Sequence, residues 1–303
     1  MSAKDKTPRS ASPQNQKALG VIGLGTMGSA MATNLVKAGY RVHGFDVVGA
    51  QREALKKAGG VPATSAAAVA QIAEVLVTSL PSSDALQAVA EELSAKGRVV
   101  METSTLPLED KERARATLAR KGIVLLDCPL SGTGAQARAK DLVVFASGDK
   151  AACEKAAAFM PGFSRAHHYL GEFGNGSRMK FVANLLVAIH NVSTAEAFVL
   201  GMKAGIEPET IYKVLGESAA TSRMFQVRGP QMVANDYSDA TISVQLFQKD
   251  MKIIGEFAAR HGVSTPLFNA AAAVYNAAMG QGLGKQDTAA VCAVLERLAG
   301  LKR

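Results

Sequence analysis

Short apolar runs alternate with alanine-rich helical windows through the first half of the chain. Beyond residue 47, the apolar runs that predict strands lie at residues 60–63, 75–79, 99–102, 124–127, 142–146 and 165–169. Helical patterns separate them, for example at residues 84–95, 108–121 and 150–159. Strands that alternate with helices in this way predict an α/β domain whose mostly parallel sheet is covered by helices on both faces.

The pattern changes after Gly176. Residues 177–204 form one long, apolar-rich helical window without proline, in which Gly201 is the only glycine. Further helical windows follow with almost no strand-like runs, and three prolines fall near expected helix boundaries, namely Pro208, Pro230 and Pro266. We therefore predict an α/β domain at residues 17–176 and an all-helical domain at residues 177–303, joined by a long helix.

The N-terminus and the net charge add little that is specific. Residues 1–16 contain Ser, Pro, Gln and a few charges but no apolar run, which predicts a flexible tail and not an export signal. The chain carries a formal net charge of +8, from 34 Lys and Arg against 26 Asp and Glu. Because no Lys/Arg-rich block or row of aromatic residues accompanies this charge, we expect anionic small ligands and no nucleic acid.

The cysteines and the length of the apolar runs indicate the compartment. Cys128, Cys153 and Cys292 are odd in number and lack the spacing of metal ligands, which favours a reducing compartment and no metal site. No stretch approaches 18 uninterrupted apolar residues, so we expect no membrane span. The sequence thus predicts a soluble, cytoplasmic protein.

Three glycines, a helix start and an acid follow one another within residues 18–46. An apolar run ends at Gly23, where the chain turns tightly; Gly25 lets a pyrophosphate approach the backbone, and Gly28 lets the following helix pack closely on the strand. The phosphates would lie at the N-terminus of that helix, against free N–H groups and the positive end of its dipole. This order predicts a Rossmann-type dinucleotide site.

The acid in this segment bears on the choice of dinucleotide. Asp46 follows the second apolar run and lies 18 residues beyond Gly28. Its carboxylate can accept hydrogen bonds from both hydroxyls of an adenosine ribose, whereas it repels a 2′-phosphate. Since Val47 and Val48 follow and no Arg does, we predict NAD in preference to NADP. Glycines and an aspartate can also merely form turns, but the strand–turn–helix–strand–Asp order favours the nucleotide site.

Two further segments carry residues suited to chemistry. Lys180 and Asn184 are four apart, so on a helix they share a face and can address one ligand. A lysine desolvated in an apolar helix has a lowered pKa and can exchange protons; the alternative is a lysine that only lays its stem on apolar surface. The glycine-containing loop at residues 127–135 exposes N–H groups that suit a carboxylate, unless it is an ordinary connection.

Together these segments resemble the β-hydroxyacid dehydrogenase family, which includes 3-hydroxyisobutyrate dehydrogenase and is related to 6-phosphogluconate dehydrogenase. The resemblance covers residues 18–300. The family's first motif is matched by GLGTMGSAMATNL at residues 23–35 and its substrate loop by DCPLSGT at residues 127–133. Its catalytic motif, Gly-x-Gly-x-x-x-Lys-x-x-Asn-Asn, is matched up to Asn184 but has Leu185 at the final position, and Lys249-Asp250 is similar to the family's Lys-Asp-Leu.

The resemblance implies roles for individual residues. Lys180 would be the catalytic acid/base, and Asn184 would orient the reacting oxygen or Lys180. The substrate carboxylate would be held by Ser131, Gly132 and Thr133, the last standing where many relatives have Gly. The residues implied at the cofactor are Gly23, Leu24, Gly25, Thr26, Met27, Gly28, Asp46, Leu80, Pro81, Thr105 and Lys249.

The activity implied is hydride transfer between NAD and a small 3-hydroxy acid of the 3-hydroxyisobutyrate, tartronate semialdehyde or threonate type, by a homodimer or homotetramer. Arg223 could pair with a polar or anionic substrate tail, or be an ordinary surface arginine. A phosphogluconate-type decarboxylating dehydrogenase is one rival, although such enzymes usually have a His where this chain has Ala183. A catalytically silent NAD-binding regulatory protein is another, and the retention of Lys180, Asn184 and Ser131 argues against it.

Overall fold

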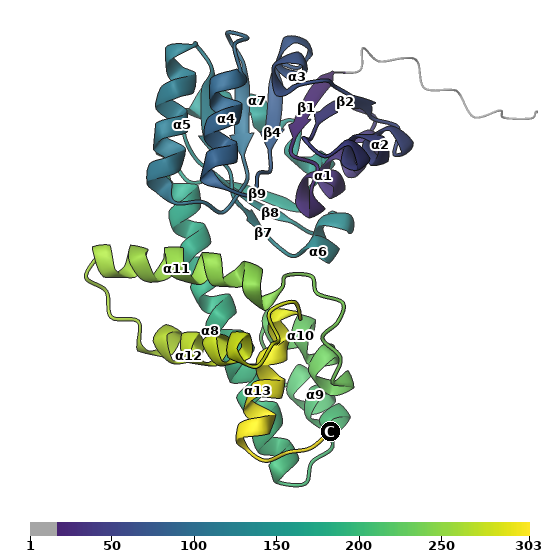
Figure 1. The fold of residues 1–303 in the computed structure, drawn as a ribbon, viewed down its shortest axis with the longest axis vertical. Coiled ribbons are helices and arrows are strands. Elements are labelled where there is room, and N and C mark those ends of the chain that lie inside the picture. Colours follow the sequence, from purple (N-terminus) through teal and green to yellow (C-terminus); the bar gives the residue numbers. More distant parts are fainter. Residues whose placement is uncertain (1–16) are drawn as a thin grey trace, which may run out of the picture.

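The computed structural model describes residues 17–303, so the flexible tail predicted at residues 1–16 lies outside the described residues. Figure 1 shows an α/β domain above a helical domain, with the long helix α8 (Asn175–Lys203) running from one into the other. The predicted fold, a Rossmann-type domain followed by a helical one, is confirmed.

The α/β domain is built on a parallel sheet of six strands in the order β3-β2-β1-β4-β5-β6. Its strands are β1 (Ala18–Ile22), β2 (Arg41–Phe45), β3 (Val61–Pro62), β4 (Val75–Thr78), β5 (Val99–Glu102) and β6 (Val124–Asp127). The chain runs outward from β1 to β3 and then returns to β4 beside β1. Such a reversal opens a crevice at the carboxyl ends of the strands, where ligands of this architecture bind.

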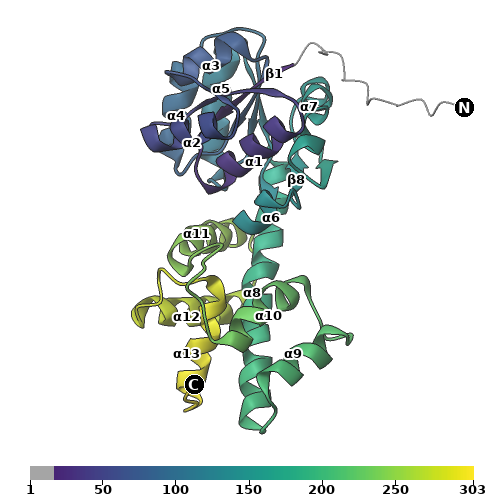
Figure 2. The ribbon, with the colours of Figure 1, turned by 90° about the vertical axis from the view of Figure 1, so that its right-hand side faces the viewer.

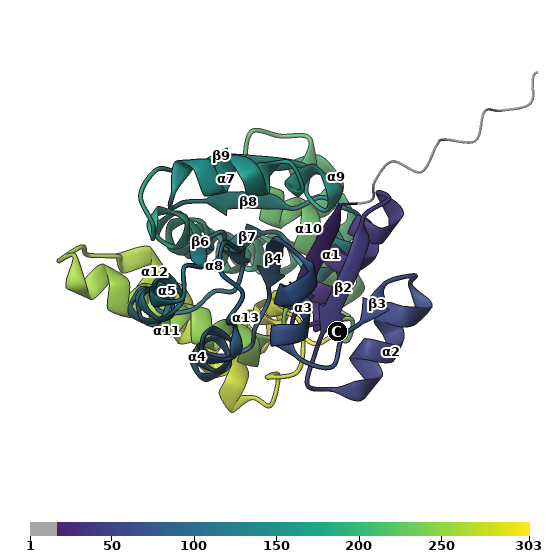
Figure 3. The same cartoon turned by 90° about the horizontal axis from the view of Figure 1, so that it is seen from above.

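Alternate residues of each strand supply the two cores of this domain. In β4, Val75 and Val77 face one side and Leu76 the other. Helices α1 (Thr26–Lys37) and α7 (Lys150–Ala157) pack on the first side. The other side is covered by α3 (Ala66–Ile72), α4 (Ser83–Glu92) and α5 (Leu108–Arg120), as the view from above shows (Figure 3). A further helix, α2 (Gly49–Lys57), links β2 to β3.

The last strands form a second, separate sheet, which corrects the expectation of a single sheet. Here β7 (Leu130–Ser131) is antiparallel to β8 (Val143–Ala146), which is parallel to β9 (Ala166–Tyr169). The chain passes from β6 to β7 through Pro129, which lacks the N–H needed to extend a central ladder, and no crossover helix intervenes. The short helix α6 (Gly134–Arg138) follows β7.

The helical domain surrounds α8. Its other helices are α9 (Pro208–Gly216), α10 (Arg223–Ala234), α11 (Val244–Arg260), α12 (Pro266–Gly280) and α13 (Val291–Leu298). In Figure 2, α9 and α10 lie on one side of α8 and the other three on the opposite side. By length and composition alone, α8 is the one helix in residues 17–303 that could span a membrane, a test that the central helix of a folded domain also passes.

Two of the three prolines predicted at helix boundaries lie there, and one does not. Pro208 and Pro266 occupy first turns, where a missing N–H is harmless. Pro230 lies inside α10, so the prediction for it was wrong. The carbonyl that its missing N–H leaves without a helical partner is that of Gln226, and this carbonyl accepts a hydrogen bond from the Tyr212 hydroxyl at 3.1 Å. A tertiary contact thus satisfies the group that would otherwise end the helix.

Candidate active site

The glycine turn between β1 and α1 has the geometry of a dinucleotide site. Gly23 adopts φ +86°, and a Cβ there would lie 2.1 Å from the carbonyl oxygen of Ser79. A Cβ on Gly28 would lie 1.9 Å from the carbonyl oxygen of Gly23, so α1 packs on the turn only because this residue is glycine. Gly25, by contrast, has no heavy atom within 4 Å of its would-be Cβ. Open space therefore lies above the backbone where a pyrophosphate would approach.

The start of α1 and Asp46 both fit a bound NAD. The N-cap of α1 is Gly25, which offers no side chain, so the first amides of Thr26, Met27 and Gly28 lack a side-chain cap and can meet phosphate oxygens. Asp46 is half-buried, and its carboxylate accepts the N–H of Leu24 at 2.7 Å. This bond ties the end of β2 to the glycine turn and fixes the carboxylate beside the position of the ribose.

An arginine does lie near this end of β2, four residues beyond the valines noted in the sequence. The Arg52 guanidinium donates to the carbonyl oxygen of Asp46 and lies over the Phe45 ring, 5.8 Å from its centroid. The Asp46 carboxylate also accepts the N–H of Val48 at 2.8 Å. Arg52 is thus engaged with the backbone of the loop, and the group presented at the ribose position is a carboxylate.

Two loops that follow strands β4 and β5 complete the cofactor side. The N–H of Leu80, next to the exposed Pro81, donates to the Ser104 hydroxyl at 2.8 Å, which joins the loops. Lys249, on α11, donates to the carbonyl oxygen of Thr105 at 2.5 Å. A lysine of the helical domain therefore reaches the α/β domain at the position expected for the nicotinamide side.

Lys180 and Asn184 lie on one buried face of α8. Their residues are 8% and 6% exposed, and Asn184 donates its side-chain N–H to Asp250 Oδ2 at 2.9 Å. Asp250 is itself buried, and its other oxygen lies 3.4 Å from the Lys249 amine. Two lysines, an amide and one carboxylate thus meet where the domains join.

The charges of this group shift its proton equilibria. Burial lowers the pKa of Lys180, an effect that the nearby Lys249 and Lys111 ammonium groups reinforce and the Asp250 carboxylate opposes. Burial also raises the pKa of Asp250, against the pull of Lys249 and Lys180. A lysine with a lowered pKa holds a larger share of neutral amine near neutral pH, which is the form that accepts a proton.

The predicted substrate loop lies at the edge of the second sheet. Ser131 ends β7, Gly132 adopts φ +137°, and Thr133 caps α6. The Thr133 N–H donates to Gln136 Oε1 at 3.0 Å, and its hydroxyl oxygen accepts the N–H of Gln136 at 3.3 Å. Only the O–H of Thr133 can therefore still donate to a ligand, so a carboxylate on this loop would depend mainly on Ser131 and Gly132.

A cavity of about 320 Å³ opens beside this loop, between the two domains. Thr26, Gly134 and Arg138 line it from the α/β domain, and Thr241 and Leu246 from the helical domain. Thr26 follows directly after Gly25 of the glycine turn, so the cavity links the cofactor side of the site to the end of the substrate loop. Its lining carries one cation, Arg138, and one carboxylate, Asp239, and it includes neither Lys180 nor Asn184 nor Ser131.

Arg223 begins α10 and is engaged in an ion pair. Its guanidinium lies 3.3 Å from Asp141 Oδ2, and this ion pair joins the helical domain to the α/β domain. Asp141 also accepts hydrogen bonds from Gln136 and Arg165. These two hydrogen bonds are the main reason why the pKa of its carboxyl lies below the ordinary value, and the positive charges of Arg165 and Arg223 lower it further. Through Asp141, Arg223 is connected to Gln136, whose side-chain oxygen accepts the N–H of Thr133 in the substrate loop. Whether it also binds substrate stays a prediction.

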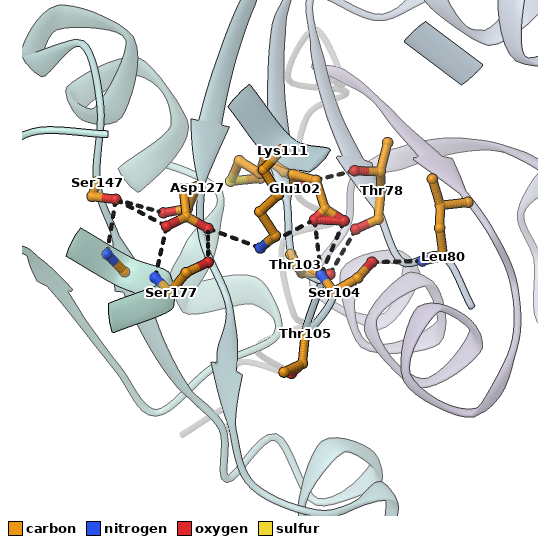
Figure 4. Close-up of polar contacts among 12 residues, drawn as sticks. Thr78, Leu80, Glu102, Thr103, Ser104, Thr105, Lys111, Asp127, Ser147 and Ser177 are labelled. Carbon is orange, nitrogen blue, oxygen red and sulfur yellow. Dashed lines mark hydrogen bonds and ion pairs between the residues drawn. The ribbon is translucent and has the colours of Figure 1, made fainter. Parts of the chain in front are cut away.

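Several polar residues of the site were not foreseen. Asp250 was noted only as part of a dipeptide, although its position directly after Lys249 was a usable signal. The buried trio of Glu102, Lys111 and Asp127 was missed, because a lysine in an amphipathic helix resembles a surface residue (Figure 4).

Within residues 17–303 no group of three or more His, Cys, Asp or Glu has an arrangement that could hold a metal ion.

Comparisons with known proteins agree with this geometry. Residues 18–171 match the family described as the NAD binding domain of 6-phosphogluconate dehydrogenase. Residues 174–295 match the family described as NAD-binding of NADP-dependent 3-hydroxyisobutyrate dehydrogenase. The chain belongs to the 3-hydroxyisobutyrate dehydrogenase family. The predicted family and the NAD-binding domain are confirmed.

Relatives within this family act on several hydroxy acids. The chain is 31% identical to an L-threonate dehydrogenase of Cupriavidus necator over 90% of this chain and 94% of the relative. It is 32% identical to an NAD-dependent L-serine dehydrogenase of Pseudomonas aeruginosa over 91% of this chain and 96% of the relative. A crystal structure of 3-hydroxyisobutyrate dehydrogenase from Salmonella typhimurium superposes with a TM-score of 0.83 at 28% identity, covering 92% of this chain and 100% of that one.

Proposed function

We propose that the protein is an NAD-dependent dehydrogenase of a small 3-hydroxy acid, of the 3-hydroxyisobutyrate, tartronate semialdehyde or threonate type. The observation that carries this proposal is the buried amine of Lys180, which shares a helix face with Asn184 at the junction of a dinucleotide-binding domain and a helical domain. The names of the relatives, which are dehydrogenases of threonate and serine, support a hydroxy acid as the substrate.

We assign the following roles to the residues of the site. When bound, the nicotinamide supplies the hydride acceptor. Lys180, neutral before turnover, takes the proton of the substrate hydroxyl, and in the reverse direction its ammonium returns that proton. Asn184, held by Asp250, orients the reacting oxygen or Lys180, while Ser131 and Gly132 hold the substrate carboxylate. General acid/base catalysis of this kind contributes a rate factor of about 10² to 10⁴.

We infer a preference for NAD from Asp46. Its carboxylate is fixed beside the ribose position by the N–H groups of Leu24 and Val48, and a negative charge there repels a 2′-phosphate. Arg52, the nearby cation, is occupied by the carbonyl oxygen of Asp46. NAD should therefore give a higher kcat/KM than NADP with the same hydroxy acid.

The decisive experiment measures NADH formation from NAD with a panel of small 2- and 3-hydroxy acids, for the unmodified protein and for Lys180→Ala. We expect turnover of at least one 3-hydroxy acid, and a loss of kcat by a factor of about 10² to 10⁴ in the variant with little change in NAD affinity. Binding of NADH without turnover of any acid would instead indicate a silent NAD-binding protein. Equal losses of kcat and NAD affinity would show that Lys180 is structural.

We also propose a homodimer or homotetramer that assembles through the helical domain. Met179, Val182 and Leu186 form an exposed apolar strip on α8, with 42%, 52% and 47% of each residue accessible. Their spacing of three and four places them on one helix face. Light scattering after size exclusion should give a mass above that of one chain, and Val182→Lys should lower it. A single-chain mass for the unmodified protein would refute this. A cytoplasmic location stays a prediction.

A further inference from the structure

A buried cation lies beneath the site on α5. The Lys111 amine is 2.8 Å from Asp127 Oδ1 and 3.5 Å from Glu102 Oε2, and all three side chains are fully buried (Figure 4). Glu102 ends β5 and Asp127 ends β6, so the lysine bridges two neighbouring strand ends. The roles proposed above for Lys180, Asn184 and Lys249 do not use this cation.

Asp127 holds the start of the helix that carries Lys180. Its Oδ2 accepts the N–H of Ser177 at 2.7 Å, and its Oδ1 accepts the Ser177 hydroxyl at 2.8 Å. The N-cap of α8 is Gly174, which has no side chain to cap the helix, so a carboxylate from another element supplies the acceptor. A negative charge at a helix N-terminus is also favoured by the helix dipole.

The backbone around this contact leaves no room for a side chain at Gly176. A Cβ on Gly176 would lie 2.4 Å from the carbonyl oxygen of Phe145 and 2.7 Å from that of Asp127. The Gly176 N–H also donates to the Ser147 hydroxyl at 2.9 Å. The first turn of α8 is therefore seated directly on the ends of β6 and β8, and Lys180 follows Ser177 by three residues, about one turn.

Glu102 extends the same connection to the cofactor side. Its two carboxylate oxygens accept the N–H of Ser104 at 3.1 and 3.0 Å, and the Ser104 hydroxyl accepts the N–H of Leu80. Thr105, whose carbonyl oxygen binds Lys249, is the next residue. Lys111 thus joins Glu102, which leads to the segment beside the nicotinamide position, to Asp127. Asp127 begins the substrate loop and binds the first turn of α8.

We propose that Lys111 is a positioning residue: through Asp127 it fixes the first turn of α8 and thereby the place of the Lys180 amine. The kinetic consequence rests on the proposed function, whereas the placement of the amine does not. The charged groups that shift the pKa of Lys180 are Asp250 and Lys249 from α11 and Lys111 from α5. If the first turn of α8 loosens, water reaches Lys180, and its pKa returns toward the ordinary value.

Two variants test this without leaving a buried charge unpaired. Ser177→Ala removes one of the two hydrogen bonds from α8 to Asp127. Lys111→Met combined with Asp127→Asn and Glu102→Gln replaces all three buried charges by neutral groups of similar size, while the new amide oxygens can still accept from Ser177 and Ser104. The control is Ser164→Ala, which deletes a buried hydrogen bond to the carbonyl oxygen of Met160 that does not involve α8.

The first readout is the pKa of Lys180, obtained from its rate of acetylation as a function of pH, with the modified peptide quantified by mass spectrometry. The second is the pH profile of kcat. In both variants we expect kcat to fall about tenfold, because a small misplacement of a reacting group is costly. The pKa of Lys180 should rise in Ser177→Ala, which removes no charge; in the other variant the loss of the Lys111 ammonium also raises this pKa, so kcat is the deciding readout there. The Ser164→Ala control should change neither.

Each outcome decides something. An unchanged pKa of Lys180 and an unchanged kcat profile in both variants would overturn the proposal. A fall of kcat in Ser177→Ala alone would overturn the assignment to Lys111, because the side-chain oxygen at position 127 would then hold α8 without the ion pair. If the unmodified protein turned over no hydroxy acid but the pKa of Lys180 rose in Ser177→Ala, the proposed function would fail and the positioning of Lys180 through Asp127 would stand.

Discussion

Replacing Lys180 by methionine should stabilise the folded protein near neutral pH, although it removes the proposed acid/base. The amine is buried, with the residue 8% exposed, and its pKa lies below the ordinary value of 10.5 chiefly because of burial. Met has a comparable length and an apolar stem, so the packing of α8 is retained. The variant therefore removes a buried charge whose net effect is unfavourable even with the attraction of Asp250 included.

The sign and the pH range follow from proton binding. Because the folded pKa of Lys180 is lowered, the unfolded chain binds the proton more tightly, and the ionised lysine reduces the free energy of unfolding at all pH values below the folded pKa. The reduction is about 1.4 kcal/mol for each unit of lowering, and it disappears as the pH rises through the folded pKa toward 10.5. Each kcal/mol corresponds to roughly 2–4 °C in Tm.

Thermal unfolding followed by circular dichroism at several pH values from neutral upward measures this effect. We expect Lys180→Met to raise Tm at neutral pH and the gain to shrink steadily in alkaline buffer. The matched control is Lys203→Met on the same helix, because Lys203 is exposed and ends α8. If Lys180→Met lowered Tm, or raised it equally at every pH, the buried ammonium would not be the cause of instability.

Three further predictions concern the cofactor and the substrate. Gly25→Ala should keep its Tm but lose about tenfold or more in NADH affinity by fluorescence titration, whereas Gly28→Ala should also lower Tm, because its Cβ would meet the Gly23 carbonyl; equal Tm values would contradict this. Asp46→Ala should raise the ratio of kcat/KM for NADP over NAD by about tenfold. Arg223→Ala should raise KM only for hydroxy acids with polar or anionic tails, and its Tm should change little because exposed ion pairs contribute about 0–1 kcal/mol. An unchanged KM for all of them would exclude Arg223 from the site.

The parts of the site that could be predicted from the sequence are those whose partners are close in the chain. The turn from Gly23 to Gly28 and the i, i+4 pair of Lys180 and Asn184 depend on local geometry, which spacing alone determines. Asp46 was also predictable, since a parallel strand returns its end to the glycine turn. The positions of these residues could be predicted without knowing how the two domains pack together.

The parts that could not be predicted depend on contacts between distant segments. Asn184 and Asp250 are 66 residues apart, and no local pattern in either segment indicates that their side chains make contact. Lys111 lies in a helix rich in charged residues, where its pattern is that of a solvent-exposed side chain; only the neighbouring strand ends explain why it is buried. Pro230 was misassigned for the same reason, because the hydroxyl that compensates for it comes from α9.

Two contacts between the domains, Lys249 with Thr105 and Arg223 with Asp141, differ in the exposure of their side chains. Lys249 binds the carbonyl oxygen of Thr105 in a partly buried position, whereas the side chains of Arg223 and Asp141 are 64% and 26% exposed. An exposed ion pair adds about 0–1 kcal/mol, so Arg223 can exchange Asp141 for an anionic substrate tail at little energetic cost. The Lys249 contact, whose lysine side chain is 39% exposed, is a separate link between α11 and the cofactor side. The proposal that Arg223 binds a polar or anionic substrate tail therefore does not require the Lys249–Thr105 contact to break.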